Sequence, residues 1–175
     1  MLNEKRIKEA ESNVRNYLRE GLLAKQSFQE IVFSVLKSNA KESLETANFL
    51  SKNSKSDLWI IVASYYSMFY IANAVLYKLG YKVGEKIAHR VTADSLIVFV
   101  RKKLADSLLE SYEDTKDSAL AAMKSDELLE SFDSERKKRS IVQYKTTDAE
   151  KKNKALISLQ RAKEFMLEME KLLSD

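Results

Sequence analysis

The chain contains one histidine, and this side chain is the one best suited to move a proton near neutral pH. His89 follows a short glycine-containing connection and precedes an apolar stretch, with Arg90 beside it. A histidine that faces a cleft can act as a general acid or base, because its ordinary pKa is about 6.5. The position also suits a capping or partly exposed structural histidine. Both interpretations stay open on sequence alone.

Basic side chains concentrate in residues 136–163, where ten Lys and Arg face Asp148 and Glu150, for a net charge of +8. Lysine and arginine neutralise phosphates, and a helix N-terminus adds free N–H donors. The alternative is a solvated face that pairs with the acidic stretch before it. The candidate nucleic-acid-binding residues are Arg136, Lys137, Lys138, Lys145, Lys151 and Lys152.

Residues 106–135 carry the opposite sign, with ten acidic side chains against two lysines, for a net charge of −8. Some of these carboxylates recur at helical spacing and could in principle gather a hard cation, but the stretch has no glycine-turned loop of the kind that binds calcium. The chain has no cysteine and no second histidine, which excludes thiolate zinc sites, iron–sulfur clusters and two-histidine metal motifs. We therefore expect no metal site and no cofactor.

The aromatic stretch Tyr65-Tyr66-x-x-Phe69-Tyr70 could stack nucleic-acid bases, although this spacing is more typical of core packing. It lies within residues 58–77, which carry no formal charge and are long enough to cross a membrane. Scattered serines and mid-segment tyrosines favour a buried central helix over a membrane span. We expect no membrane association.

The composition predicts an all-α fold in one domain that covers residues 1–175. Hydrophobic residues make up 45% of the chain, proline is absent, and there are only three glycines, so the punctuation that sandwiches and barrels need is missing. The N-terminus mixes charges from the start and shows no secretory signal or transit peptide. We therefore expect a cytoplasmic protein.

Apolar periodicity predicts an up-and-down antiparallel bundle of five to six helices. The expected helices are residues 4–25, 28–50, 58–79, and a long stretch from 91 to 132 that bends at an unidentified point. Residues 51–56 read as a loop, with Ser56 or Asp57 as the next helix cap, and Gly80 as a left-handed terminator. Thr147-Asp148-Ala149-Glu150 reads as a capping box that opens the last helix.

Three landmarks in order resemble one family. The stretch Ala63-Ser64-Tyr65-Tyr66-Ser67-Met68-Phe69-Tyr70 continues to Leu76 and is followed by Gly80 and His89, and Arg139-x4-Tyr144 precedes a closing helix that contains Ala162-Lys163-Glu164-Phe165. This pattern resembles small prokaryotic members of the HEPN (higher eukaryotes and prokaryotes nucleotide-binding) superfamily. The likeness covers about residues 36–173, and the first helix and the acidic 105–135 region read as additions.

The resemblance implies a helical bundle that often dimerises. It also implies members that act as metal-independent ribonucleases and members that pair, as toxin and antitoxin, with a minimal nucleotidyltransferase. Catalytic members carry an R-x4-6-H motif near the dimer interface. Here Arg139 matches the arginine, Tyr144 stands at a comparable spacing, and no histidine follows, so His89 would have to approach in space. Loss of the dedicated histidine favours binding over catalysis.

Three hypotheses follow. The first is a cytoplasmic homodimer, as the resemblance implies, that binds RNA or a nucleotide-bearing partner through residues 136–154. The second is an active metal-independent endoribonuclease of toxin type that uses Arg139, Tyr144 and His89. The third is a protein-interaction bundle that pairs with a nucleotidyltransferase and never touches nucleic acid. A steep loss of binding with salt would separate phosphate recognition from an apolar protein interface.

Overall fold

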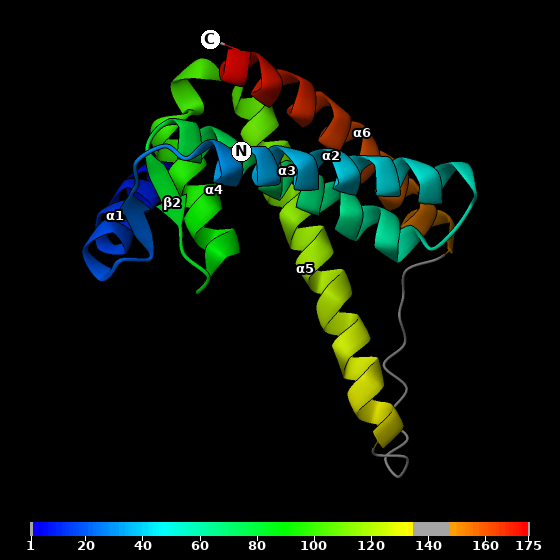
Figure 1. Cartoon of the computed structure of the whole chain (residues 1–175). Helices are drawn as coiled ribbons and strands as arrows, with labels where there is room; N and C mark the ends of the chain where they lie inside the picture. Colours follow the sequence, from blue (N-terminus) through cyan, green and yellow to red (C-terminus); the bar gives the residue numbers. More distant parts are fainter. Residues whose placement is uncertain (1, 135–147, 175) are drawn as a thin grey trace.

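The computed structural model describes residues 2–134 and 148–174, with side chains up to residue 124 and from residue 149. The described part is almost entirely helical, which confirms the all-α prediction (Figure 1). The elements in chain order are α1 (Glu4–Glu20), β1 (Leu23–Lys25), α2 (Glu30–Lys52), α3 (Asp57–Lys78), β2 (Tyr81–Val83), α4 (Ala88–Phe99), a short 3-10 turn (Arg101–Lys103), α5 (Asp106–Ser134) and α6 (Asp148–Ser174).

Helix α3 is the centre of the fold, as its lack of charge predicts. Its N-terminus is capped by Ser56, whose side-chain oxygen accepts a hydrogen bond from the backbone N–H of Trp59 at 3.4 Å. It stops before Gly80, which takes a left-handed conformation with φ of 88°. Fourteen of its residues are buried, including Tyr65 and Met68, so this helix supplies the largest share of the core.

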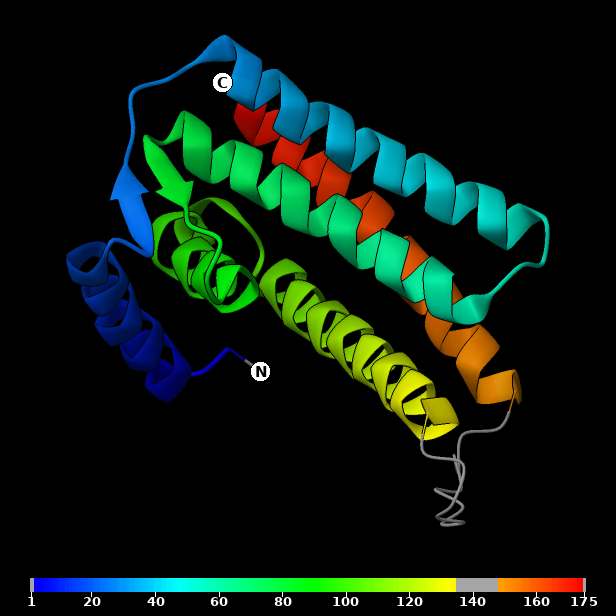
Figure 2. The same ribbon diagram turned by 60° about the horizontal axis from the view of Figure 1, so that its bottom comes forward.

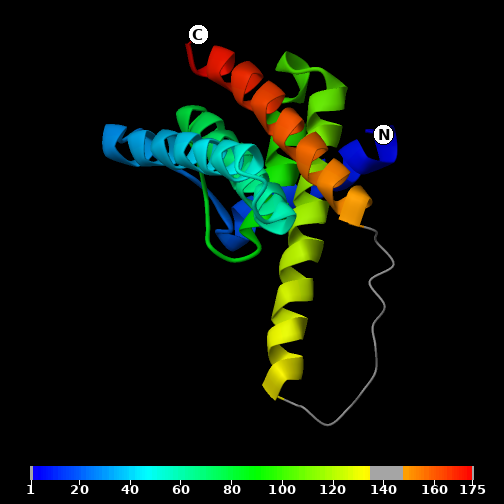
Figure 3. The same cartoon turned by 90° about the vertical axis from the view of Figure 1, so that its right-hand side faces the viewer.

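Helices α2, α3, α5 and α6 alternate in direction around this core, which confirms the up-and-down arrangement. Figure 2 shows α2 and α5 running one way and α3 and α6 the other, and Figures 1 and 3 show that α5 crosses the other three at a steep angle. The ends of α3 and α6 meet where the Lys78 ammonium donates to the backbone oxygen of Leu173 at 2.8 Å. Phe165 of α6 is fully buried and packs on Tyr112 of α5, with ring centroids 5.3 Å apart. The C-terminal half of α5 projects from the bundle (Figure 3).

Helix α3 satisfies the length and composition of a membrane span, with a mean hydropathy of 1.4 over its apolar window. That window is 61% buried inside the fold. Length and composition alone are weak support for a span, because the core helix of a folded bundle passes the same test. The burial of α3 agrees with the interpretation as a core helix.

The predicted first helix, residues 4–25, is too long. Helix α1 ends at Glu20 because Gly21 turns left-handed with φ of 74°. Residues 23–25 then form β1, which pairs antiparallel with β2, Leu23 opposite Val83. Each strand has three residues and its partner lies more than fifty positions away in the chain, so no local pattern announces the pair.

Two other boundaries also differ from the prediction. Helix α2 continues through Ser51 and Lys52, so the loop is shorter than residues 51–56. The expected long helix from residue 91 is two helices, α4 and α5, separated by residues 100–105 with the 3-10 turn. The capping box cannot be judged, because Thr147 lies outside the described residues.

A buried carboxylate on α4 links helix α1 to the bundle, beside the apolar contacts of Val14 and Tyr17. Asp94 is 1% exposed and accepts three contacts, all from α1: Arg6 Nη1 at 2.7 Å, Tyr17 hydroxyl at 2.8 Å and Asn13 amide at 3.0 Å. Arg6 also donates to Glu113 of α5 at 2.6 Å. One guanidinium therefore joins α1, α4 and α5, and a buried carboxylate needs such partners to stay charged.

We predict that Asp94→Asn lowers the free energy of unfolding by about 2–3 kcal/mol, because the Arg6 guanidinium loses one of its two carboxylates inside the fold. Urea unfolding followed by circular dichroism measures this change. Glu9→Gln is the matched control, since the exposed Glu9 lies 3.8 Å from Arg90 and its loss should cost less than about 1 kcal/mol. Equal effects of the two substitutions would contradict the central role of Asp94.

Candidate functional site

His89 lies in the first turn of α4, at the point where the chain leaves β2. The residue that begins this turn, Ile87, has a left-handed backbone with φ of 47°, which a β-branched residue rarely adopts. The imidazole lies against α3, with its ring centroid 4.8 Å from Phe69 and 6.0 Å from Tyr66. Its Nδ1 lies 2.7 Å from the Tyr65 hydroxyl. This hydrogen bond fixes the orientation of the ring.

The surroundings of His89 keep it uncharged. Burial lowers the pKa of His89, and the nearby positive charge of Lys116 lowers it further. Burial also raises the pKa of Tyr65 well above its ordinary value, so the hydroxyl keeps its proton. His89 and Tyr65 therefore form a neutral hydrogen-bonded pair at physiological pH, in which either partner can donate.

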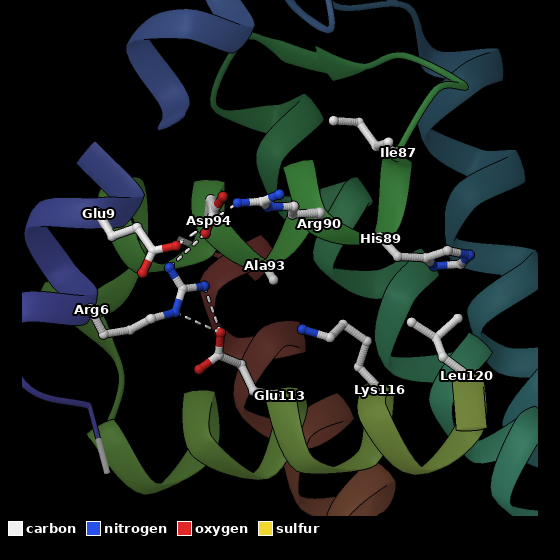
Figure 4. A pocket seen from close by; sticks show the side chains of 10 residues that line it. All are labelled: Arg6, Glu9, Ile87, His89, Arg90, Ala93, Asp94, Glu113, Lys116 and Leu120. Atoms are coloured by element: carbon white, nitrogen blue, oxygen red, sulfur yellow. Dashed lines mark hydrogen bonds and ion pairs between the residues drawn. The ribbon is translucent and has the colours of Figure 1, made fainter. Parts of the chain in front are cut away.

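A cleft of about 420 Å³ opens between α1, α4 and α5 beside this pair. Figure 4 shows the Lys116 side chain extending into it from α5, and the His89 ring at its edge, turned toward α3. The lining combines three basic and three acidic side chains with a few apolar ones: Arg6, Glu9, Ile87, His89, Arg90, Ala93, Asp94, Glu113, Lys116 and Leu120.

The six charged side chains of the cleft are not equally available to a ligand. Arg6 is held by both Asp94 and Glu113, and the hydrogen bonds to these carboxylates raise its pKa despite the opposing effect of burial. Arg90 and Glu9 form only a loose exposed pair at 3.8 Å. The Lys116 side chain is 15% exposed, and its ammonium lies 3.4 Å from the carboxylate of Asp117, an exposed neighbour in the chain. The basic groups left to meet an incoming anion are therefore Arg90 and Lys116.

The structure describes only part of the predicted site. His89 and the exposed Lys151 and Lys152, in the first turn of α6, belong to the described residues. The others fall in the segment 135–147, outside the described residues: Arg136, Lys137, Lys138, Arg139, Tyr144 and Lys145. The proposed approach of His89 to Arg139 therefore stays a prediction.

Sequence reasoning missed Lys116 and Asp94. In the sequence, Lys116 stands out only as one of two lysines in an acidic stretch. The signal that was missed is spacing: Lys116 lies four residues after Tyr112 and four before Leu120, on the apolar face of α5. Asp94 is the one charged residue in the apolar run 91–100, which is the signal of a buried carboxylate. That its partners lie on α1 could not be read from any local pattern.

Metal binding has no support in the part of the chain described here. Within it, no three histidine or carboxylate side chains come together in a group that could hold a metal ion. Two of the acidic residues that recur at helical spacing on α5 have different partners: Glu113 binds Arg6 of α1, and Asp114 binds Arg161 of α6 at 3.1 Å. They act as links between helices.

The fold and the site define an all-helical domain whose cleft holds a neutral histidine and available cations. A family model described as HEPN domain matches residues 33–172, and the chain belongs to this family. The match starts within α2, so α1 lies before it. Searches of the curated proteins and of the solved structures gave no significant match. HEPN domains are in general associated with nucleotides or RNA.

We predict that the pKa of His89 lies below 6.5 and rises when the positive charge beside it is removed. Lys116→Gln should shift the midpoint upward, because the imidazolium then forms without a neighbouring cation. NMR titration of the single imidazole measures this directly. Lys124→Gln, an exposed lysine two turns further along α5, is the control and should leave the midpoint in place. A midpoint above 6.5 in the wild type would contradict the described environment.

Proposed function

We propose that this HEPN-family protein binds RNA and that the cleft between α1, α4 and α5 receives one of its phosphates. The observation that carries the proposal is the Lys116 ammonium, which extends into the cleft beside the uncharged His89 while the carboxylates of Asp94 and Glu113 are occupied by Arg6. An incoming phosphate would thus meet a cation in a partly desolvated site, where the attraction is stronger than in open water.

The other side chains of the cleft, Arg90 and His89, suit a phosphate better than an apolar ligand. Arg90 lines the same cleft and its pair with Glu9 is long and exposed, so it can turn to an anion at little cost. The half-buried imidazole supplies a further polar contact without adding a charge. Two cations and a hydrogen-bonding ring suit the several oxygens of a phosphate.

The basic segment extends the proposed contact surface along the chain. Lys151, Lys152 and Lys154 are exposed in the first two turns of α6 and continue the basic residues of 136–145. Helix α6 is joined to α5, the helix that carries Lys116, by the ion pair of Arg161 and Asp114 at 3.1 Å. We propose that the RNA backbone runs from the cleft to the start of α6.

Membership of the family also guides the proposed partners. We propose that the protein forms a homodimer in the cytoplasm and that a nucleotidyltransferase-type protein is its partner in a toxin–antitoxin type pair. A bundle that only binds such a partner remains the competing function. The two are distinguished by salt, since phosphate contacts release counterions and an apolar interface does not.

We predict that the protein binds a fluorescently labelled single-stranded RNA with an affinity that falls steeply as salt rises. The double substitution Arg90→Gln and Lys116→Gln should reduce the slope of log K against log salt by about 1.4, the value for two phosphate contacts on a single strand. Fluorescence anisotropy between about 50 and 200 mM salt measures the slope.

The control variant for this experiment also removes two positive charges, but at positions outside the cleft. Lys41→Gln and Lys171→Gln remove two exposed cations, on α2 and near the end of α6, each paired with a carboxylate of its own helix. Their slope should stay close to that of the wild type. If both double variants lose the same slope, binding follows net charge and the cleft is not the phosphate site. If the wild type does not bind RNA, the partner-only function takes its place.

RNA cleavage is a second candidate function, favoured by the neutral state of His89. A neutral imidazole can take the proton of a ribose 2′-hydroxyl as its oxygen attacks the adjacent phosphorus. The bond to the 5′-oxygen breaks, leaving a 2′,3′-cyclic phosphate, and the departing oxygen takes a proton from water. The required tautomer is the one in which Nδ1–H donates to the Tyr65 oxygen and leaves Nε2 unprotonated. Arg139 would then stabilise the developing charge, with Tyr144 beside it in the chain.

If this candidate is right, labelled single-stranded RNA is cut in excess EDTA, and His89→Gln and Arg139→Ala each lower the rate by at least about 100-fold. Because the pKa of His89 is lowered, the imidazole stays unprotonated at neutral pH, and the rate should fall only as the pH drops below 6.5. Gel analysis of the cyclic-phosphate product measures the rate. Full activity of His89→Gln would exclude His89 as the base.

A further inference from the structure

The described residues leave one stripe of helix α3 less covered than the faces that pack into the core. Trp59, Ala63, Tyr66 and Tyr70 recur at i, i+4, i+7 and i+11 and therefore lie on one face of the helix. Trp59 is 53% exposed, and the other three are only partly buried against the core. We call Trp59, Tyr66 and Tyr70 the aromatic stripe. Its exposure is not explained by core packing.

The aromatic stripe is continuous with the cleft. The Tyr66 ring lies 5.9 Å from that of Tyr70 on one side and 6.0 Å from the imidazole of His89 on the other, where the cleft begins. The stripe itself carries no charge, whereas Arg90 and Lys116 lie in the cleft at its end. The cations can contact the phosphates of a single-stranded RNA, and the aromatic rings can stack with its bases.

We propose that the aromatic stripe is a stacking surface for unpaired bases, so that the protein selects single-stranded over double-stranded RNA. This inference rests on the proposed RNA function and names the kind of RNA that the site takes. Each base has an apolar π-face, and stacking on aromatic side chains is tolerant of sequence. In a duplex these faces are covered by neighbouring bases and cannot reach the stripe.

A second copy of the chain is a less suitable occupant of the aromatic stripe. The stripe spans twelve residues of one helix, residues 59–70 or about 16 Å, and two of its three rings are partly buried. Such a narrow surface falls well short of the roughly 800 Å² per partner that a stable interface buries. It has the width of a single nucleic-acid strand.

The chain provides its own probe, because Trp59 is the one tryptophan among its 175 residues. We expect intrinsic fluorescence to fall when a base stacks on Trp59. Single-stranded oligouridine and oligoadenosine should quench it, whereas a duplex of the two strands and inorganic phosphate should not. The titrations are run at low salt with wild-type protein, beside anisotropy of a labelled single strand, which reports binding independently of Trp59.

Substitutions extend the test. Tyr66→Leu and Trp59→Leu should each weaken binding of the single strand by about tenfold, which corresponds to the loss of one stacked base. Phe28→Leu is the matched control, since Phe28 is 52% exposed and contacts Tyr77 near the other end of α3. The affinity of this variant for the single strand should equal that of the wild type. Thermal unfolding of each variant shows that the fold is retained.

The outcomes separate this inference from the proposed function. Salt-dependent binding without quenching, with Tyr66→Leu and Trp59→Leu as tight as wild type, would overturn the stacking surface and leave the phosphate cleft. Equal affinity for duplex and single strand would overturn it as well. Absence of any RNA binding would overturn both. If light scattering shows that Trp59→Leu or Tyr66→Leu halves the mass of the particle, the stripe is an interface between copies of the chain.

Discussion

The architecture depends on the removal of α3 from water. A helix of twenty-two residues with one charge at each end can be stable in water only if neighbours cover most of its circumference. Helices α2 and α6 cover two sides and α5 a third, and each contributes an amphipathic face for that purpose. Because α2 reaches α3 through a short loop, these two helices must run antiparallel. Helix α5 then runs against α3, and α6 runs against α5. The His89 turn is placed by the same helix, since its imidazole packs on the aromatic residues of α3.

Charge inside the cleft is arranged by a second constraint, the burial of Asp94. An ionised carboxylate that is almost fully enclosed must be satisfied by donors, and here all of them come from α1. Arg6 contacts both Asp94 and Glu113, so the two carboxylates that line the cleft from α4 and α5 share a cation from a helix that precedes the family match. Without α1 these carboxylates would face the cleft and repel an anion. The N-terminal helix is thus part of the site and not only an addition to the fold.

Sequence was most informative where the physical signal is local. The uncharged run 58–77, the serine before it and Gly80 after it predict α3 and both of its ends, because burial, capping and left-handed backbone each act within a few residues. Contacts between residues far apart in the chain produce the features that the sequence did not predict. These are the β1–β2 pair, the partners of Asp94 and the place of Lys116 in the cleft. Periodicity carries no information about which helix a polar side chain will face. The sequence therefore identified His89 as a candidate residue but could not predict the cleft beside it.

The uncovered face of α3 and the uncharged His89 have a common origin. Covering α3 completely would need another helix beside Tyr66, and that helix would also enclose His89 and the mouth of the cleft. The described chain instead places a turn at this point, where the left-handed Ile87 starts α4 and stops it from running alongside α3. The histidine is then half-buried, which lowers its pKa, and Tyr66 beside it stays only partly buried. The proposed RNA site would therefore combine the cleft, the imidazole and the aromatic stripe on the side of α3 that the described residues cover least.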